Sequence, residues 1–320
     1  MKKHLYLIMA LATILLASCK NEDITITREI KFTVNPYEVV DVFVNNQVNV
    51  GDLDELYTGQ MLRVQVLVYD AEGQLANYDV QYLANYHSTM NTAFDLDDGN
   101  YTAIAITDVV EYNGSSVTLE YWRHEGKDRL STLKINHGGY LGYESKILGI
   151  GHVNFKVQPG QNTIAVPVEP QGALMLNIVW GIHSFNDVTC YDLMTNRSFN
   201  RFEFEDDGSC KLYYDDVNYI TYLYRFAPAN YSSYGGYGYQ FVPAVNTGFR
   251  CDAETTSGNL QDITGGAKTK NIALGGMYQF ELFLPDLTFT ISSMSNGKGA
   301  SQDNLSRCVD KSQYCGLGDR

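Results

Sequence analysis

The side chains best suited to catalysis in this sequence are histidines and paired carboxylates, and neither group forms a known catalytic pattern. No H-x-H, H-E-x-x-H or G-x-S-x-G motif occurs, so the sequence indicates neither a metal hydrolase nor a serine hydrolase. The pairs Asp206-Asp207 and Asp215-Asp216 would serve a glycosidase only if two carboxyl groups faced each other about 5–10 Å apart. We interpret these pairs as solvated surface residues and expect that the chain is not an enzyme. The histidines considered are His87, His124, His137, His152 and His183.

One carboxylate-rich segment, DLDDGN at residues 95–100, has the composition of a calcium-binding loop. An EF-hand loop places glycine sixth and a bidentate glutamate twelfth. Here the glycine, Gly99, is fifth and the twelfth residue is Ile106. Because Asp and Gly are also favoured in turns, we expect a hairpin turn. The sequence predicts neither a metal site nor a cofactor.

A different chemistry is indicated at Cys19. Lys2 and Lys3 precede an apolar run over residues 5–17, which is too short to span a bilayer as a helix and is typical of a secretory signal. The run ends in LASC at residues 16–19, which resembles a bacterial lipobox. That resemblance implies cleavage before Cys19 and attachment of acyl chains, including palmitate, to the cysteine, with outer-membrane lipid as the partner. The alternative is an ordinary signal peptide in which Cys19 is incidental.

The residues after the cleavage site carry a second targeting signal. Lys20 is followed by Asn21 and then by the paired acids Glu22 and Asp23, a pattern similar to the surface-export signal of Bacteroidetes lipoproteins. We therefore expect the protein on the outer membrane, facing the cell surface. Loss of Lys2 and Lys3 with the signal takes the formal charge from −14 to −16. This charge excludes nucleic acid as a partner, because nucleic-acid binding needs basic surfaces.

Five cysteines follow Cys19, and all lie in the second half of the chain. Export permits disulfides, and the odd number leaves at least one thiol free or paired between chains. Cys308 and Cys315 flank a six-residue loop, and Cys190 and Cys210 flank an expected hairpin, so we predict these two bridges. A zinc site is not supported, because no C-x-x-C and no suitably spaced His occur. The five are Cys190, Cys210, Cys251, Cys308 and Cys315.

The chain between the signal and the tail is typical of an all-β protein. Short segments alternate apolar and polar residues with period two, and turn residues separate them. The clearest segment is LRVQVLVYDAEGQL at 62–75, in which Leu62, Val64, Val66 and Val68 share one face and 70–73 forms a turn. We expect a central strand there. Further strands are expected at 24–27, 30–34, 39–44, 77–83, 94–96, 101–107, 117–122, 130–135, 153–157, 163–168, 173–180, 188–193, 199–204, 210–214, 219–226, 271–274, 278–284 and 287–291.

The length of the exported chain allows two domains of about 150 residues. Turn clusters at 158–161 and 169–172 flank the strand 163–168, and a dense apolar run begins at Ala173, so we place the boundary near residue 169. The expected organisation is a signal peptide at 1–18, a lipidated tether at 19–29, a β-sandwich at 30–169, a second β-sandwich at 170–291 and a polar, mobile or loosely docked tail at 292–320.

The segment YSSYGGYGY at 231–239 has a composition suited to molecular contact. Tyrosine combined with serine and glycine places rigid aromatic area on an adaptable backbone, as in many binding loops. A self-packed surface loop is an equal alternative, since loops do not always carry function. The candidate contact residues are Tyr231, Tyr234, Tyr237 and Tyr239.

The first part of the chain resembles the first domain of the Bacteroidetes fimbrial anchor and subunit lipoproteins, the fimbrillin-associated family. The resemblance rests on the lipobox, on LRVQVLVYDAEGQL at 62–75 and on FDLDDGNYTAIAI at 94–106. The resemblance implies two transthyretin-like, Greek-key β-sandwich domains, a role in fimbria assembly and adhesion, and fimbrial subunits as partners. The chain departs from the family at 166–170, which lacks the usual basic residue before the next strand, and in its two-cysteine tail.

Three functions are consistent with these features. The first is a fimbrial anchor or subunit whose contacts form by β-strand addition. The second is a surface glycan-binding lipoprotein of a nutrient-uptake system, with an exposed Trp122 and the 231–239 loop as stacking surfaces, binding a host or other glycan ligand. The third, an exported hydrolase, lacks a motif and ranks last.

Overall fold

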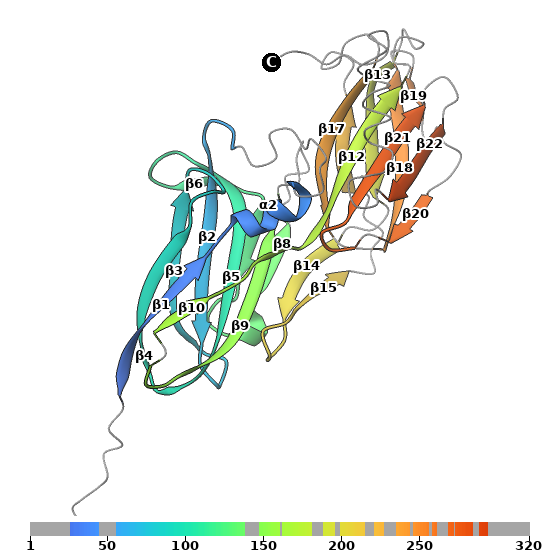
Figure 1. The fold of residues 1–320 in the computed structure, drawn as a ribbon. Helices are drawn as coiled ribbons and strands as arrows, with labels where there is room; N and C mark the ends of the chain where they lie inside the picture. The colour runs from blue at the N-terminus through green and yellow to red at the C-terminus, as the bar shows by residue number, and fades with distance from the viewer. Residues whose placement is uncertain are drawn as a thin grey trace, which may run out of the picture.

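The computed structural model describes an almost entirely β protein, which confirms the expected fold class. The strands form several separate sheets that pack face to face, and none of the sheets described closes into a barrel (Figure 1). No helix among the described residues is long and apolar enough to cross a bilayer. The residues described are 26–44, 56–137, 147–160, 162–180, 188–195, 199–214, 221–226, 235–243, 246–255, 258–260, 268–271, 273–283 and 288–293.

The first sheet, here called the front sheet, has the order β10-β1-β4. Its middle strand β1 runs parallel to β10 and antiparallel to β4. The alternation expected for a half-buried strand is present in β1, where Ile30, Phe32 and Val34 are buried. The front sheet therefore contributes one wall of the core. Its strands are β1 (Thr27–Val34), β4 (Met90–Asp97) and β10 (Thr163–Ala165).

The second sheet, the central sheet, has the order β11-β9-β5-β2-β3, and β6 pairs with β5. The predicted central strand is confirmed as β2, whose residues Leu62, Val64, Val66 and Val68 are fully buried. The predicted reversal after β2 is also confirmed, since Gly73 adopts a φ of 72° and Asp70 accepts its amide hydrogen at 3.0 Å. The strands are β2 (Gln60–Tyr69), β3 (Leu75–Leu83), β5 (Gly99–Tyr112), β6 (Val117–Glu120), β9 (Gly149–Val157) and β11 (Glu169–Pro170).

A third layer, the cover sheet, has the order β15-β14-β8-β7. It covers the face of the central sheet that points away from the front sheet, and the rings of Trp122 and Phe202 lie 6.1 Å apart within it. As a result, β2 is buried on both faces from Leu62 to Tyr69. The elements of this layer are β7 (Trp122–Glu125), the 3-10 helix η1 (Leu130–Thr132), β8 (Lys134–His137), β14 (Phe199–Phe204) and β15 (Cys210–Tyr214).

The remaining strands form two further sheets, at the upper right of Figure 1. One has the order β17-β12-β21-β22, and the other has the order β16-β13-β18-β19 with β20 paired to β18. Their strands are β12 (Gly172–Trp180), β13 (Val188–Thr195), β16 (Thr221–Phe226), β17 (Gly235–Pro243), β18 (Asn246–Thr255), β19 (Gly258–Leu260), β20 (Lys268–Asn271), β21 (Met277–Phe283) and β22 (Thr288–Ser293).

The chain changes sheets close to the predicted domain boundary. β11 at 169–170 still pairs with β9 of the central sheet, and β12 begins another sheet at Gly172. The β14–β15 hairpin, which follows this boundary in the sequence, nevertheless joins a sheet formed by strands that precede it, because Phe202 of β14 pairs with Ile135 of β8. The division at residue 169 stays a prediction, and the chain segments on its two sides are interleaved through the cover sheet.

The strand expected at 39–44 is wrong, because these residues belong to the helix α2 (Tyr37–Val44). Asn35 and Pro36 precede the helix, and the side chain of Asn35 accepts a hydrogen bond from the Tyr37 amide at 3.3 Å. Val39, Val40 and Phe43 are buried at helical spacing. Burial of that face outweighs the strand preference of the β-branched residues.

The hairpin predicted at 95–100 is also wrong. β4 pairs with β1 in the front sheet, whereas β5 pairs with β2 and β9 in the central sheet. The turn between them therefore carries the chain from one layer to the other. Two more predicted strands are interrupted: 117–122 is divided between β6 and β7, and 130–135 starts as η1.

Candidate interaction surfaces

The predicted targeting residues and part of the predicted contact segment cannot be compared with the structure. The lipidation and export residues and the two tail cysteines lie outside the described residues, and so do two of the four tyrosines. Their roles stay predictions. The residues concerned are Cys19, Lys20, Glu22, Asp23, Tyr231, Tyr234, Cys308 and Cys315.

Tyr237 and Tyr239 belong to a strand and not to a loop, which corrects the expectation for that part of the segment. They lie in β17, where Tyr237 pairs with Ile178 and Tyr239 with Leu176 of β12. β17 is the first strand of its sheet in the order β17-β12-β21-β22. An adaptable loop conformation is therefore excluded for residues 235–239.

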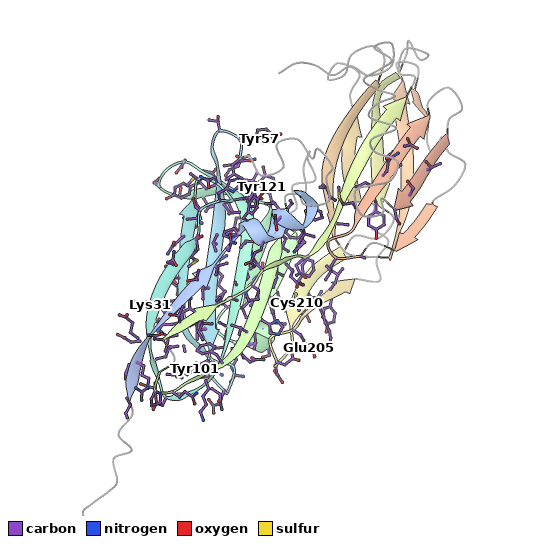
Figure 2. All side chains as sticks on the ribbon, in the orientation of Figure 1. Lys31, Tyr57, Tyr101, Tyr121, Glu205 and Cys210 are labelled. Atoms are coloured by element: carbon purple, nitrogen blue, oxygen red, sulfur yellow. The ribbon has the colours of Figure 1, made fainter. Side chains whose placement is uncertain are left out.

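The predicted bridge between Cys190 and Cys210 is not formed. Cys210 is a free cysteine in β15 of the cover sheet, and Cys190 lies in β13 of a different sheet. Figure 2 shows Cys210 on the same hairpin as Glu205. Burial raises the pKa of the Cys210 thiol to about 12, so the thiol is protonated and unreactive at neutral pH.

Trp122 does not offer a stacking surface for a glycan. Its exposed fraction is 0%, and it is the largest fully buried side chain of the described chain. Its ring packs on Phe202 beneath the cover sheet. The glycan-binding alternative therefore loses this residue.

His183 lies outside the described residues, and the described histidines lie on separate segments of the fold. His87 stacks on Tyr37 with ring centroids 4.5 Å apart, and His124 is buried among polar side chains. No group of three metal-ligating side chains was found among the described residues. Asp207 of the predicted acidic pair binds the Ser209 amide at 2.9 Å and completes the β14–β15 turn.

A groove lies between the edges of the front and central sheets, where β10 and β9 run past each other. We call it the β9–β10 groove. Its volume is about 440 Å³, and Phe155 and the buried Ile164 contribute apolar surface to it. It is lined by Val153, Asn154, Phe155, Lys156, Gln158, Thr163, Ile164 and Ala165.

The β9 side of the groove has an open strand edge. One edge of β9 pairs with β5 from Gly149 to Val157, but among the described pairings the other edge is occupied only at Gly149 and Ile150, by β11. Gly151 marks the limit of the covered part, since a Cβ atom there would lie 1.6 Å from the Pro167 carbonyl oxygen. Beyond this point, residues 153–156 of β9 line the groove.

Among the described pairings β10 pairs with β1 alone, so its other edge is open as well. The Asn162 carbonyl accepts from the Lys31 amide at 2.9 Å, and the Val166 amide donates to the Thr33 carbonyl at 3.0 Å. Main-chain groups of successive residues in a strand point to opposite edges. The amides and carbonyls of Thr163 and Ala165 therefore point away from β1, toward the groove. Unpaired strand edges of this kind are templates for another strand.

The sequence reasoning missed a buried polar network on the cover side of the central sheet. Arg63 of β2 makes two hydrogen bonds to Asp108 of β5, with Nε–Oδ1 at 2.9 Å and Nη2–Oδ2 at 2.7 Å. It also binds Glu120 and donates to the Trp122 carbonyl at 2.7 Å. The side chains of Arg63 and Asp108 are only 5% and 0% exposed. The sequence did carry one sign of this network: two otherwise apolar segments each contain a charged residue, Arg63 and Asp108, which pair across β2 and β5.

The same network extends to Gln65, His124 and Lys127. Gln65 binds a ring nitrogen of His124 and accepts from Lys127 Nζ at 2.8 Å. Burial raises the pKa of Asp108 to about 6, although Arg63 opposes the shift. Burial, with Arg63 and Lys127, holds the pKa of His124 well below its usual value, so His124 is neutral. The Arg63–Asp108 pair at its centre is buried and the network joins β2, β5, β6 and β7, so we assign it to the packing of the cover sheet.

No model of a known protein family matches the chain, and no curated protein matches it in sequence. Several solved structures are similar to it. One is a protein proposed to bind polysaccharide, from Bacteroides thetaiotaomicron, with 14% identity, a TM-score of 0.48 and coverage of 83% of this chain and 95% of that one. Another is the fimbrial anchor protein Mfa2 from Porphyromonas gingivalis, with 11% identity, a TM-score of 0.43 and coverage of 83% and 95%.

A third similar structure is a fimbrial assembly protein from Parabacteroides distasonis, with 9% identity, a TM-score of 0.38 and coverage of 84% of this chain and 100% of that one. The proteins that the chain is similar to thus include a fimbrial anchor, as the resemblance in the sequence predicted. Identities and TM-scores this low carry no argument about function.

Proposed function

We propose that this protein is a non-catalytic surface lipoprotein that acts as an anchor or subunit in fimbria assembly and adhesion, and that it contacts a neighbouring subunit by β-strand addition in the β9–β10 groove. The observation that supports the strand addition most directly is the pair of open strand edges, on β9 and on β10, that face one groove. The predicted lipidation of Cys19 supports the location at the cell surface, and the sequence resemblance supports fimbrial subunits as the partners.

The groove has the features that strand addition requires. Main-chain groups on either side can each contribute a hydrogen bond worth about 0.5–1.5 kcal/mol, and the side-chain surface supplies selectivity. Val153, Phe155 and Ile164 provide that surface. Phe155 is held in place by edge contact with Phe32, at 5.6 Å between centroids. An incoming strand with alternating apolar residues would complete a continuous sheet edge.

Ala165→Pro tests the proposal. Proline removes the amide hydrogen that points toward the groove, and an edge strand tolerates it. The β1–β10 hydrogen bonds described above use Asn162 and Val166, so they remain. We expect a fimbrial protein to co-purify with the wild type from native membranes, and its recovery to fall strongly with Ala165→Pro.

Ala165→Ser is the matched control, because it changes the side chain and keeps the amide. Co-purification should be unchanged in this variant. Equal recovery of the partner with Ala165→Pro and with the wild type, at equal thermal stability, would show that the β10 edge does not bind the partner.

A further inference from the structure

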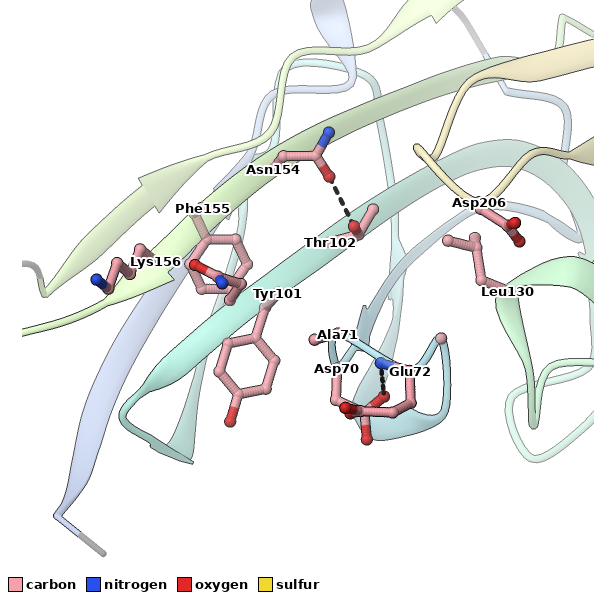
Figure 3. Close-up of a pocket in the computed structure, with 12 residues that line it drawn as sticks. Asp70, Ala71, Glu72, Tyr101, Thr102, Leu130, Asn154, Phe155, Lys156 and Asp206 are labelled. Atoms are coloured by element: carbon pink, nitrogen blue, oxygen red, sulfur yellow. Dashed lines mark hydrogen bonds between the residues drawn. The ribbon is translucent and has the colours of Figure 1, made fainter.

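A second hollow lies at the end of the central sheet away from α2, and the proposed role in fimbria assembly does not use it. Its volume is about 640 Å³, within the range of small-molecule sites. We call it the turn pocket, because the β2–β3 turn at 70–73 and the β14–β15 turn at 205–208 form two of its sides (Figure 3). Strands β5 and β9 contribute the polar residues Asn100, Asn154 and Lys156.

The turn pocket is held in shape by hydrogen bonds between the segments that form it. Asp70 Oδ1 accepts from the amides of Glu72 and Gln74 at 3.0 and 2.8 Å, which fixes the first turn. The Leu130 amide donates to the Gly73 carbonyl at 2.9 Å and ties that turn to η1. Such a pocket loses little conformational entropy when a ligand binds.

The second turn is fixed from the opposite side. Asn154 Nδ2 donates to the Asp207 carbonyl at 3.0 Å, and Asn154 Oδ1 accepts from Thr102 at 2.6 Å, as Figure 3 shows for the latter bond. Gly208 allows the close approach, since a Cβ there would lie 2.8 Å from the Thr102 methyl carbon. The pocket is therefore completed by a hairpin from the second half of the chain.

The polar groups at the pocket offer both hydrogen-bond donors and acceptors. Lys156 supplies an ammonium group, Glu72 and Asp206 supply carboxylates, and Asn100 supplies both functions of an amide. These four side chains are exposed. A hydroxyl group donates and accepts at once, so a mixed set of this kind suits a ligand rich in hydroxyl groups.

The same lining disfavours charged ligands. Asp70, Glu72 and Asp206 outnumber Lys156, which opposes phosphate, sulfate or carboxylate groups. Lys156 in turn opposes a cation. Leu130 supplies apolar surface for the carbon skeleton of a ligand.

We propose that the turn pocket binds a short, uncharged saccharide. Carboxylates and amides pair with sugar hydroxyl groups, and the apolar surface packs on sugar C–H groups. Asn154, Phe155 and Lys156 of β9 line both this pocket and the β9–β10 groove, whereas Asn100 and Asp206 line the turn pocket and not the groove. Saccharide binding here would give the surface protein a glycan-recognition site that uses neither Trp122 nor the 231–239 segment.

The test is an array of neutral, sialylated and sulfated oligosaccharides probed with the whole mature chain carrying Cys19→Ala, followed by calorimetry with the best neutral glycan. We expect binding to neutral glycans, with affinity about tenfold weaker in Asp206→Ala and in Asn100→Ala, as expected for loss of one hydrogen bond to a ligand. Asp95→Ala, which removes an exposed carboxylate of β4 that does not line the pocket, is the control and should bind as the wild type does.

Three results would overturn the proposal. The first is no binding to any glycan on the array. The second is binding confined to sialylated or sulfated glycans. The third is neutral-glycan affinity that is the same in Asp206→Ala, Asn100→Ala and Asp95→Ala, which would place the site elsewhere on the protein.

Discussion

Removing the carboxylate of Asp108 should destabilise the protein severely, because Arg63 would remain buried beside the vacated position. The two side chains make hydrogen bonds at 2.9 and 2.7 Å and are almost completely excluded from solvent. Breaking a buried ion pair by removing one partner typically costs about 3–5 kcal/mol. Arg63 keeps its contacts with Glu120 and the Trp122 carbonyl, so we expect Asp108→Ala to cost about 3 kcal/mol, near the lower end.

Replacing both members of the pair should have a much smaller effect. The desolvation of two charges is costly, and well-packed apolar residues of similar volume can replace a buried pair with little loss or with a gain. We therefore expect Arg63→Met combined with Asp108→Leu to lie within about 1 kcal/mol of the wild type. The single and double variants together separate the cost of an unpaired charge from the net contribution of the pair.

Urea unfolding followed by tryptophan fluorescence measures both effects, since Trp122 is buried next to the network. Asp98→Ala is the control: it removes an exposed ion pair with Arg28 at 2.6 Å, and exposed pairs contribute little. A loss below about 1 kcal/mol in Asp108→Ala, or a double variant no more stable than the single one, would refute the account of this network.

Three further outcomes are expected. The folded state holds the Asp108 proton more tightly than the unfolded chain does, because the pKa of Asp108 is raised to about 6 in the folded protein. Relative to Asp108→Asn, the wild type should therefore lose stability as pH rises from about 4 to 6 and show no further change above about 7. Urea unfolding at each pH measures this, and a stability difference that is constant across the range would contradict the raised pKa. Val66→Asp places an unpaired charge at a fully buried position and should cost several kcal/mol, enough to threaten folding by circular dichroism, whereas near-normal stability would mean that Val66 is not in the core. Cys19→Ala should leave the protein soluble on cell fractionation, and continued sedimentation with the outer membrane would argue against lipidation at Cys19.

The parts of the fold that the sequence predicted are those governed by local patterns. The alternation in 62–69 and the turn residues at 70–73 were sufficient to place β2 and its reversal, since both depend on neighbouring residues. The strand prediction for residues 39–44 failed because it, too, rested on local pattern alone. Their β-branched composition favours a strand, and only the packing of Val39 and Phe43 against the rest of the fold produces the helix.

The candidate sites depend on contacts between distant segments, which the sequence pattern did not contain. Arg63 and Gln65 alternate with the apolar residues of β2, and the cover sheet buries their face of the strand with residues drawn from 122–137 and 199–214. The turn pocket likewise depends on the β14–β15 hairpin, whose turn forms one of its sides. The β9–β10 groove follows from the register of β10 on β1 and from the short pairing of β11 with β9.

The most direct test of strand addition is site-specific photocrosslinking in the native host. A photoreactive amino acid at Thr163, on the open edge of β10, should form a covalent adduct with a fimbrial subunit that mass spectrometry identifies. The same group at Asp95, on the exposed face of β4, should not form this adduct. Adduct formation at Asp95 but not at Thr163, or at neither position while assembled fimbriae are present, would contradict the proposed contact.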